Sequence, residues 1–183
     1  MYNNTRIFRN TEWRRWPVGQ QLIIREAVEE DETMMRCIYN ACMGKEPWAA
    51  DYRLYTEKAM HSFFEEKREK GYPVLVAVMG GRLVGFISAK QFTEWKTEGN
   101  VWEYGVYVDG ACRRMGVATA LLESLCTRAV EEGVESLMAC IDVKNVSSLW
   151  FHENRGFVSV GSFTKWRKEG EPRTVALYEL ELT

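Results

Sequence analysis

The sequence has little net charge, no closely spaced cysteine pair and no long apolar run, and each absence excludes a class of function. Its 24 basic and 26 acidic residues leave a formal net charge of −2, which argues against a nucleic-acid partner. Five cysteines without a C-x-x-C pair and only two histidines predict reduced thiols and no bound metal. No segment approaches membrane-spanning length, and the N-terminus lacks the apolar stretch of a signal peptide. We therefore expect a soluble, cytoplasmic protein with no membrane partner.

The chain has the size of one folded domain. Its 183 residues are enough to bury a sizeable core without disulfides or metals. Residues 1–20 carry tryptophans and arginines around Pro17 without clear periodicity, which is typical of a loosely packed arm, although the tryptophans could also dock on the body of the protein or on a second subunit. The sequence thus predicts an N-terminal extension over 1–20 and a single domain over 21–183.

Hydrophobic periodicity predicts an α/β protein with a mixed sheet flanked by helices. The predicted strands are 22–27, 73–79, 82–92, 101–108, 135–143, 157–163 and 173–182, and the predicted helices are 29–42, 57–70, 118–130 and 145–155. Gly80-Gly81 predicts a tight hairpin turn, and Gly105 suggests a bulge or a close approach by a ligand. The apolar run 135–143 is typical of a buried parallel strand, so 101–143 predicts a right-handed βαβ unit.

The turn of this βαβ unit carries an unusual charge pattern. Arg113 and Arg114 lie where the helix is predicted to begin, at the end of the helix dipole that favours acidic side chains. An uncapped helix start beside Gly116 is typical of a phosphate site, although a plain loop with two solvated arginines would have the same sequence. The turn contains neither G-x-x-x-x-G-K-[ST] nor the three glycines of a dinucleotide fingerprint.

The pattern Arg113-x-x-Gly116-x-Ala118 resembles the coenzyme A pyrophosphate loop of the GNAT N-acetyltransferases. From about Leu22 to Leu182 the chain is similar to the phosphinothricin acetyltransferase-like branch of that superfamily. The landmarks that carry the resemblance are Ile38-Tyr39-Asn40, Gly71-Tyr72-Pro73-Val74-Leu75-Val76-Ala77, Gly81-Arg82-Leu83-Val84-Gly85, Glu103 before Val106-Tyr107-Val108, and Asn145-x-x-Ser148-x-x-x-His152-Glu153-x-x-Gly156-Phe157.

The resemblance implies a GNAT acyl-CoA N-acyltransferase fold with splayed central strands, acetyl-CoA as co-substrate, and a homodimer. It implies that the backbone of Val106, Tyr107 and Val108 pairs with the pantetheine arm and that Asn145 reaches the cofactor. The pyrophosphate would be held by the loop and first helical turn, namely Arg113, Arg114, Met115, Gly116, Val117, Ala118 and Thr119.

Acetyl transfer to an amine needs a deprotonated nucleophile, a donor to the oxyanion and a proton for the departing thiolate. Glu103 interrupts an apolar strand, and the resemblance implies that it is the general base; it could also be an ordinary edge-strand carboxylate. A backbone N–H between Gly105 and Val108 is the candidate oxyanion donor. His152 stands where many GNAT enzymes have a tyrosine acid, so it is a candidate acid or substrate-orienting residue, or a structural histidine.

The acceptor side departs from the family pattern in 43–48 and 165–172, so phosphinothricin is not assumed. The sequence predicts direct N-acetylation of a small, amino-acid-like amine, without an acetylated Cys112. The alternatives are a protein or peptide N-acetyltransferase and a non-catalytic acyl-CoA sensor. Trp48, Tyr52 and Trp95 favour a closed small-molecule pocket over an open peptide groove.

Overall fold

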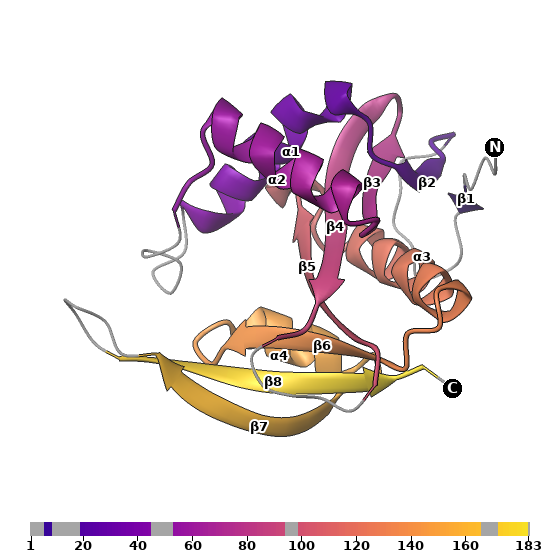
Figure 1. Ribbon diagram of the computed structural model, residues 1–183. Helices are drawn as coiled ribbons and strands as arrows, with labels where there is room; N and C mark the ends of the chain where they lie inside the picture. Colours follow the sequence, from indigo (N-terminus) through magenta and orange to yellow (C-terminus); the bar gives the residue numbers. More distant parts are fainter. Residues whose placement is uncertain (1–5, 9–18, 45–52, 94–98, 166–171, 183) are drawn as a thin grey trace. The chain divides into compact units, whose positions relative to one another are not determined.

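The computed structural model describes residues 6–8, 19–44, 53–93, 99–165 and 172–182 (Figure 1). It divides the chain into two compact units, the first comprising Met1–Ala89 and Gly105–Arg128 and the second Lys90–Tyr104 and Ala129–Thr183. Three elements run from one unit into the other, namely β4 (Arg82–Gln91), β5 (Val101–Val108) and α3 (Val117–Glu131).

The first unit contains an antiparallel run of strands in the order β1-β2-β3-β4. Its further elements are β1 (Arg6–Phe8), β2 (Leu22–Glu26), η1 (Glu29–Asp31), α1 (Glu32–Met43), α2 (Glu57–Glu69), β3 (Val74–Met79) and η3 (Gly110–Cys112). Gly80 and Gly81 both have positive φ, 57° and 77°, as the predicted two-residue hairpin between β3 and β4 requires. Strand β1 lies within the segment that the sequence analysis assigned to an extension, and it pairs with β2.

One hydrophobic cluster holds the first unit's helices to its strands. Met35 of α1, Met60 of α2 and Phe86 of β4 are each at most 1% exposed and belong to this cluster. The start of α3 also packs directly on β4, since a Cβ at Gly85 would lie 3.2 Å from Val117 Cγ1 and 3.3 Å from Leu121 Cδ1. Glycine at position 85 therefore sets how closely the helix start approaches the strand.

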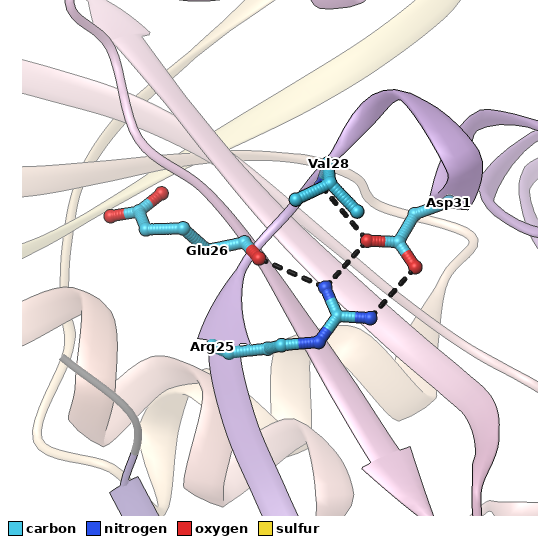
Figure 2. Close-up of polar contacts among 4 residues, drawn as sticks. All are labelled: Arg25, Glu26, Val28 and Asp31. Carbon is cyan, nitrogen blue, oxygen red and sulfur yellow. Dashed lines mark hydrogen bonds and ion pairs between the residues drawn. The ribbon is translucent and has the colours of Figure 1, made fainter. Parts of the chain in front are cut away.

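A charged pair joins the end of β2 to η1. Figure 2 shows the Arg25 guanidinium turned toward Asp31, with Nη1–Oδ2 and Nη2–Oδ1 distances of 2.6 and 2.9 Å. The Val28 N–H donates to the same carboxylate, and Arg25 donates to the carbonyl oxygen of Glu26, whose own carboxylate points away. Although burial opposes ionisation of Asp31, these donors hold the pKa of its carboxyl below the usual value.

The second unit is built from the strand order β5-β6-β8-β7. Its further elements are β6 (Ser136–Asp142), α4 (Val146–Glu153), β7 (Val158–Lys165) and β8 (Arg173–Glu181). Strand β6 pairs in parallel with Val101–Glu103 of β5 and antiparallel with β8, which pairs antiparallel with β7. The β5–β6 pairing confirms the parallel strands of the predicted βαβ unit, whose right-handedness stays a prediction, and the sheet is mixed, as predicted.

The predicted strands and helices agree with those of the structure to within a few residues at each end. Gly71, Gly133 and Gly156 follow α2, α3 and α4 with positive φ, in keeping with their predicted role as helix stops. The described residues contain no helix long and apolar enough to cross a membrane. All five cysteines carry free thiols.

Several predictions fall outside the described residues. They are the loosely packed arm apart from 6–8 and 19–20, the aromatic residues Trp48, Tyr52 and Trp95, and most of the loops 43–55, 94–100 and 165–172. The division into an extension and a single domain, and the splay of the central strands, stay predictions.

Candidate active site

The predicted site residues fall into two groups, one in each unit. Val106 to Thr119 belong to the first unit, whereas Glu103, Asn145 and His152 belong to the second. Each group is therefore described within its own unit.

The C-terminal half of β5 offers a backbone edge in the first unit. The Asp109 N–H donates to Val84 O at 2.9 Å, so the backbone groups of Asp109 point toward β4. Because successive residues of a strand direct their N–H and C=O groups to opposite edges, those of Val106 and Val108 point the other way. Cys42 Sγ donates to Val108 O at 3.5 Å on that side. An extended ligand chain pairing with β5 would do so at Val106 and Val108.

A neighbour in the same strand explains why position 105 is a glycine. A Cβ at this position would lie 2.9 Å from the hydroxyl oxygen of Tyr107. The Tyr107 ring is itself held between Tyr39 and Phe86, with centroid distances of 5.0 and 4.9 Å. A side chain at position 105 would therefore collide with the Tyr107 ring, while the bulge or ligand approach suggested by the sequence stays a prediction.

Asp109 and Cys112 shape the turn that follows β5. Asp109 caps η3 by accepting from the Ala111 N–H at 3.0 Å, and it forms an ion pair with Arg82. Cys112 is buried, and burial together with the nearby Asp109 charge raises the pKa of its thiol. A thiol that stays protonated near neutral pH is a poor nucleophile. Cys112 therefore does not fit a covalent role.

The loop before α3 contains two residues in the left-handed region of backbone conformation. Arg114 adopts a left-handed conformation with φ of 61°, and Gly116 has φ of 86°. Arg113, directly before Arg114, is extended, with φ of −63° and ψ of 151°. A left-handed arginine costs about 1 kcal/mol, so the surrounding structure must stabilise this conformation.

The helix itself begins at Val117, three residues beyond Arg114. Arg113 and Arg114 lie in the turn before it with exposed side chains, in keeping with the predicted helix over 118–130 and the predicted turn that precedes it. The first turn, Val117-Ala118-Thr119, has no acidic residue to satisfy its N–H groups. Exposed guanidinium groups beside these N–H groups fit a pyrophosphate, so the residues present match the cofactor that the sequence predicted.

Glu103 in the second unit lies opposite Lys90. The Phe92 N–H donates to Val101 O at 2.9 Å, which brings Lys90 directly across from Glu103 two residues further along the hairpin. Lys90 Nζ lies 3.0 Å from Glu103 Oε2, and the two side chains are 50% and 21% exposed. The candidate base is thus a partly exposed carboxylate with a cation at hydrogen-bond distance.

His152 is held in one tautomer within a buried aromatic group. Its Nδ1 lies 2.7 Å from the Ser148 carbonyl oxygen, which can only accept, so Nδ1 carries the proton and Nε2 the lone pair. The ring contacts Tyr104 and Phe157, with centroid distances of 5.8 and 5.0 Å. Burial lowers the pKa of His152 even though the Ser148 carbonyl favours the charged form. The imidazole is therefore neutral near pH 7.

The contacts of these two candidates come from different sides of β5. His152 touches Tyr104, and the side chain of the adjacent Glu103 leaves the strand from the opposite face. The structure therefore pairs Glu103 with Lys90, and His152 with Tyr104 and Phe157. A direct contact between the two predicted catalytic residues is not part of this arrangement.

Asn145 acts as the N-cap of α4. Its Oδ1 accepts from the Ser148 N–H at 3.2 Å and from the Ser147 hydroxyl at 3.0 Å. The amide nitrogen is the part of Asn145 that could donate to a ligand.

The sequence analysis did not foresee several polar pairs of the second unit. The pairing of Lys90 with Glu103 was not predicted, because it depends on the register between β4 and β5. That register in turn depends on the length of the loop that joins the two strands. The buried Asp142 carboxylate lies 2.7 Å from Arg173 Nε, and the Tyr178 hydroxyl donates to Glu153 at 2.7 Å. Both pairs join residues far apart in the chain, so no local pattern marks them. Within the described ranges, no group of three metal-binding side chains occurs.

Known proteins similar to this chain are acetyltransferases. A model of the acetyltransferase (GNAT) family matches residues 33–157. The L-methionine sulfoximine/L-methionine sulfone acetyltransferase of Pseudomonas aeruginosa is 27% identical over 135 residues, which cover 73% of this chain and 78% of that protein.

Solved structures share the fold along nearly the whole chain. The ribosomal-protein-alanine N-acetyltransferase of Brucella melitensis has a TM-score of 0.79 and 29% identity, over 87% of this chain and 99% of that one. The yncA acetyltransferase of Salmonella typhimurium, solved with its cofactor acetyl-CoA, has a TM-score of 0.76 and 25% identity, over 88% and 94% of the two chains. These similarities confirm the predicted fold class.

Proposed function

The chain belongs to the acetyltransferase (GNAT) family, and from this premise we propose that it acetylates the amine of a small, amino-acid-like molecule by direct transfer. The relative from Pseudomonas aeruginosa, which acts on L-methionine sulfoximine and L-methionine sulfone, supports this class of acceptor. The observation that carries the proposal is the loop at Arg114 and Gly116, where two left-handed residues precede a helix start without an acidic residue.

This loop would hold the pyrophosphate of acetyl-CoA. Its contributors are Arg113, Arg114, Met115, Gly116, Val117, Ala118 and Thr119, through backbone N–H groups and guanidinium charge. Val106, Tyr107 and Val108 would pair with the pantetheine arm, and Asn145 would donate through its amide nitrogen. When bound, acetyl-CoA supplies the acetyl group as a thioester.

Glu103 would accept a proton from the substrate ammonium, directly or through a water, so that the amine nitrogen gains a free lone pair. A partly exposed carboxylate can both meet an incoming amine and pass the proton on to solvent. His152 would orient neighbouring groups through its Nε2 lone pair, because a neutral imidazole has no proton to give from that atom.

Direct transfer without an acetylated cysteine is supported by the buried, protonated thiol of Cys112. A substrate amine that attacks the thioester itself requires both substrates to be bound at once. The proposed kinetic pattern is therefore a ternary complex.

The enzyme would work in the cytoplasm as a homodimer. Val146 and Trp150 are 70% and 66% exposed, and they lie four residues apart on one face of α4. Two exposed apolar side chains on one helix face support the proposal that this face is buried against a second copy of the chain.

The test is the Glu103→Gln variant, assayed for acetyl-CoA turnover with L-methionine sulfone and a panel of amino acids, polyamines and peptides. We expect kcat to fall by about 100-fold or more, as removal of a general base typically does, with unchanged acetyl-CoA affinity. Lys70→Met, which removes an exposed lysine that pairs with Glu66, serves as the surface control. Wild-type activity retained by Glu103→Gln would contradict the assignment of the base.

A second candidate function is acetylation of a protein N-terminus. The structural similarity to a ribosomal-protein-alanine N-acetyltransferase favours it. Peptides beginning with alanine discriminate the two functions, since a small-molecule enzyme would turn them over far more slowly than the matching free amino acid. A non-catalytic acyl-CoA sensor would bind acetyl-CoA and acetylate no member of the panel.

A further inference from the structure

Lys90 has no role in the proposed function, yet it forms an ion pair with the proposed base Glu103. The two side chains lie directly across from one another on β4 and β5, with 3.0 Å between Nζ and Oε2. The unlike charges are thus held side by side by the antiparallel register and not by flexible loops. Both side chains remain in contact with solvent, so a small solute can reach them.

An α-amino acid carries the complementary pattern of charges. Its ammonium and its carboxylate are attached to one carbon atom, so the two charges are about as close together as those of Lys90 and Glu103. A zwitterion laid against the pair can meet each protein charge with its opposite. Charge-assisted hydrogen bonds of this kind are among the stronger polar contacts.

We infer that Lys90 binds the α-carboxylate of the substrate while Glu103 receives its ammonium. This inference rests on the proposed function and sharpens its substrate class to zwitterionic amino acids. Lys90 is then a specificity-determining residue, since it binds the α-carboxylate, which an amino acid has and a simple amine lacks. In the absence of substrate Lys90 neutralises Glu103, and on binding it turns to the substrate carboxylate.

The inference also separates amino acids from other amines. Polyamines and amino-acid amides present an ammonium without a nearby carboxylate. Lys90 would therefore remain opposite Glu103, with no substrate anion to bind. Such a substrate would bring its positive charge next to an existing cation. We therefore expect wild-type enzyme to prefer an amino acid over its own amide.

The experiment compares L-methionine sulfone with L-methionine sulfone amide in wild-type protein and in Lys90→Met, Lys90→Arg and Lys70→Met. The quantity measured is the ratio of kcat/KM for the acid to that for the amide. We expect Lys90→Met to lower this ratio by about 10- to 100-fold, mainly through KM for the acid. Lys90→Arg should recover most of the preference, and Lys70→Met should leave it at the wild-type value.

The outcomes distinguish the two levels of the proposal. A wild-type enzyme that acetylates the acid, with an unchanged ratio in Lys90→Met, overturns the role of Lys90 and leaves the acetyltransferase function intact. If the wild type acetylates neither compound nor any other L-amino acid, the proposed function fails and the inference fails with it. Thermal unfolding of each variant confirms that a loss of preference does not come from unfolding.

Discussion

The Nδ1 atom of His152 lies 2.7 Å from the carbonyl oxygen of Ser148, one turn earlier on α4. This contact keeps the ring proton on Nδ1 and leaves Nε2 with a lone pair. Since burial also lowers the pKa of His152, the side chain stays neutral above its usual pKa of 6.5. A residue in this state accepts a hydrogen bond and does not supply a proton to a leaving group.

The His152→Gln variant tests this assignment. Glutamine retains polar atoms without the ring, so we expect kcat to fall by about 10-fold, less than the 100-fold or greater effect of losing a general acid. The measurement is the pH dependence of kcat between about pH 6 and pH 10, and any alkaline limb of the wild-type profile should persist in the variant. Disappearance of that limb in His152→Gln would instead identify His152 as the acid.

The Arg114→Gly variant separates cofactor binding from folding. Glycine adopts a φ of 61° without penalty, so the free energy of unfolding should stay the same or rise by up to about 1 kcal/mol. Loss of the guanidinium should weaken acetyl-CoA binding by about 10-fold, measured by calorimetry. Gly116→Ala is the matched variant, since it should weaken binding and also destabilise the protein. A strongly destabilised Arg114→Gly protein would mean that the arginine side chain supports the fold.

The Asp31→Asn variant tests the pair that joins β2 to η1. Because Arg25 and the Val28 N–H favour the ionised carboxylate despite its burial, the pKa of Asp31 lies below its usual 3.8 in the folded protein. Its stabilising contribution is present above that pH and is lost as pH falls through the folded pKa. We expect Asp31→Asn to lower the free energy of unfolding by about 1 to 2 kcal/mol at pH 7. The difference in unfolding free energy between wild type and variant should shrink at acid pH, which urea unfolding at a series of pH values measures. A difference that stays constant across pH would contradict the assignment.

The Arg173→Met variant should be among the most destabilising single changes in the second unit. It leaves the Asp142 carboxylate, whose side chain is only 3% exposed, without its cationic partner. Removing one member of a buried pair typically costs about 3 to 5 kcal/mol. For a chain of this length we expect the midpoint of thermal unfolding to fall by about 6 °C or more. A midpoint within about 2 °C of wild type would show that the pair contributes little.

Most elements could be predicted from the sequence because their signals are local. Alternating apolar residues marked 101–108, helical spacing marked 118–130, and glycines at 71, 133 and 156 marked helix ends. The parallel pairing of β5 with β6 also followed from local evidence, since a continuous apolar run is typical of a strand buried on both faces. Strand β1 had no such signal, because its pairing with β2 depends on contacts across more than ten residues.

The candidate site was predictable where its chemistry resides in consecutive residues. The loop from Arg113 to Thr119 could be recognised from the charge and glycine pattern alone, although the left-handed conformation of Arg114 could not. Its positive φ is stabilised by the surrounding structure, which no local preference of arginine would suggest.

The sequence by itself determined the family, the acetyl donor and the elements that carry the site, because these depend on periodicity and on short contiguous motifs. Only the tertiary structure decided which charges meet. The register of the β4–β5 hairpin sets Lys90 against Glu103, the packing around α4 makes His152 neutral, and the pairing of β6 with β8 brings Arg173 to Asp142. Each of these depends on contacts between residues that are remote in the chain, and hydrogen bonds and ion pairs form only when the groups come within a few ångströms of one another.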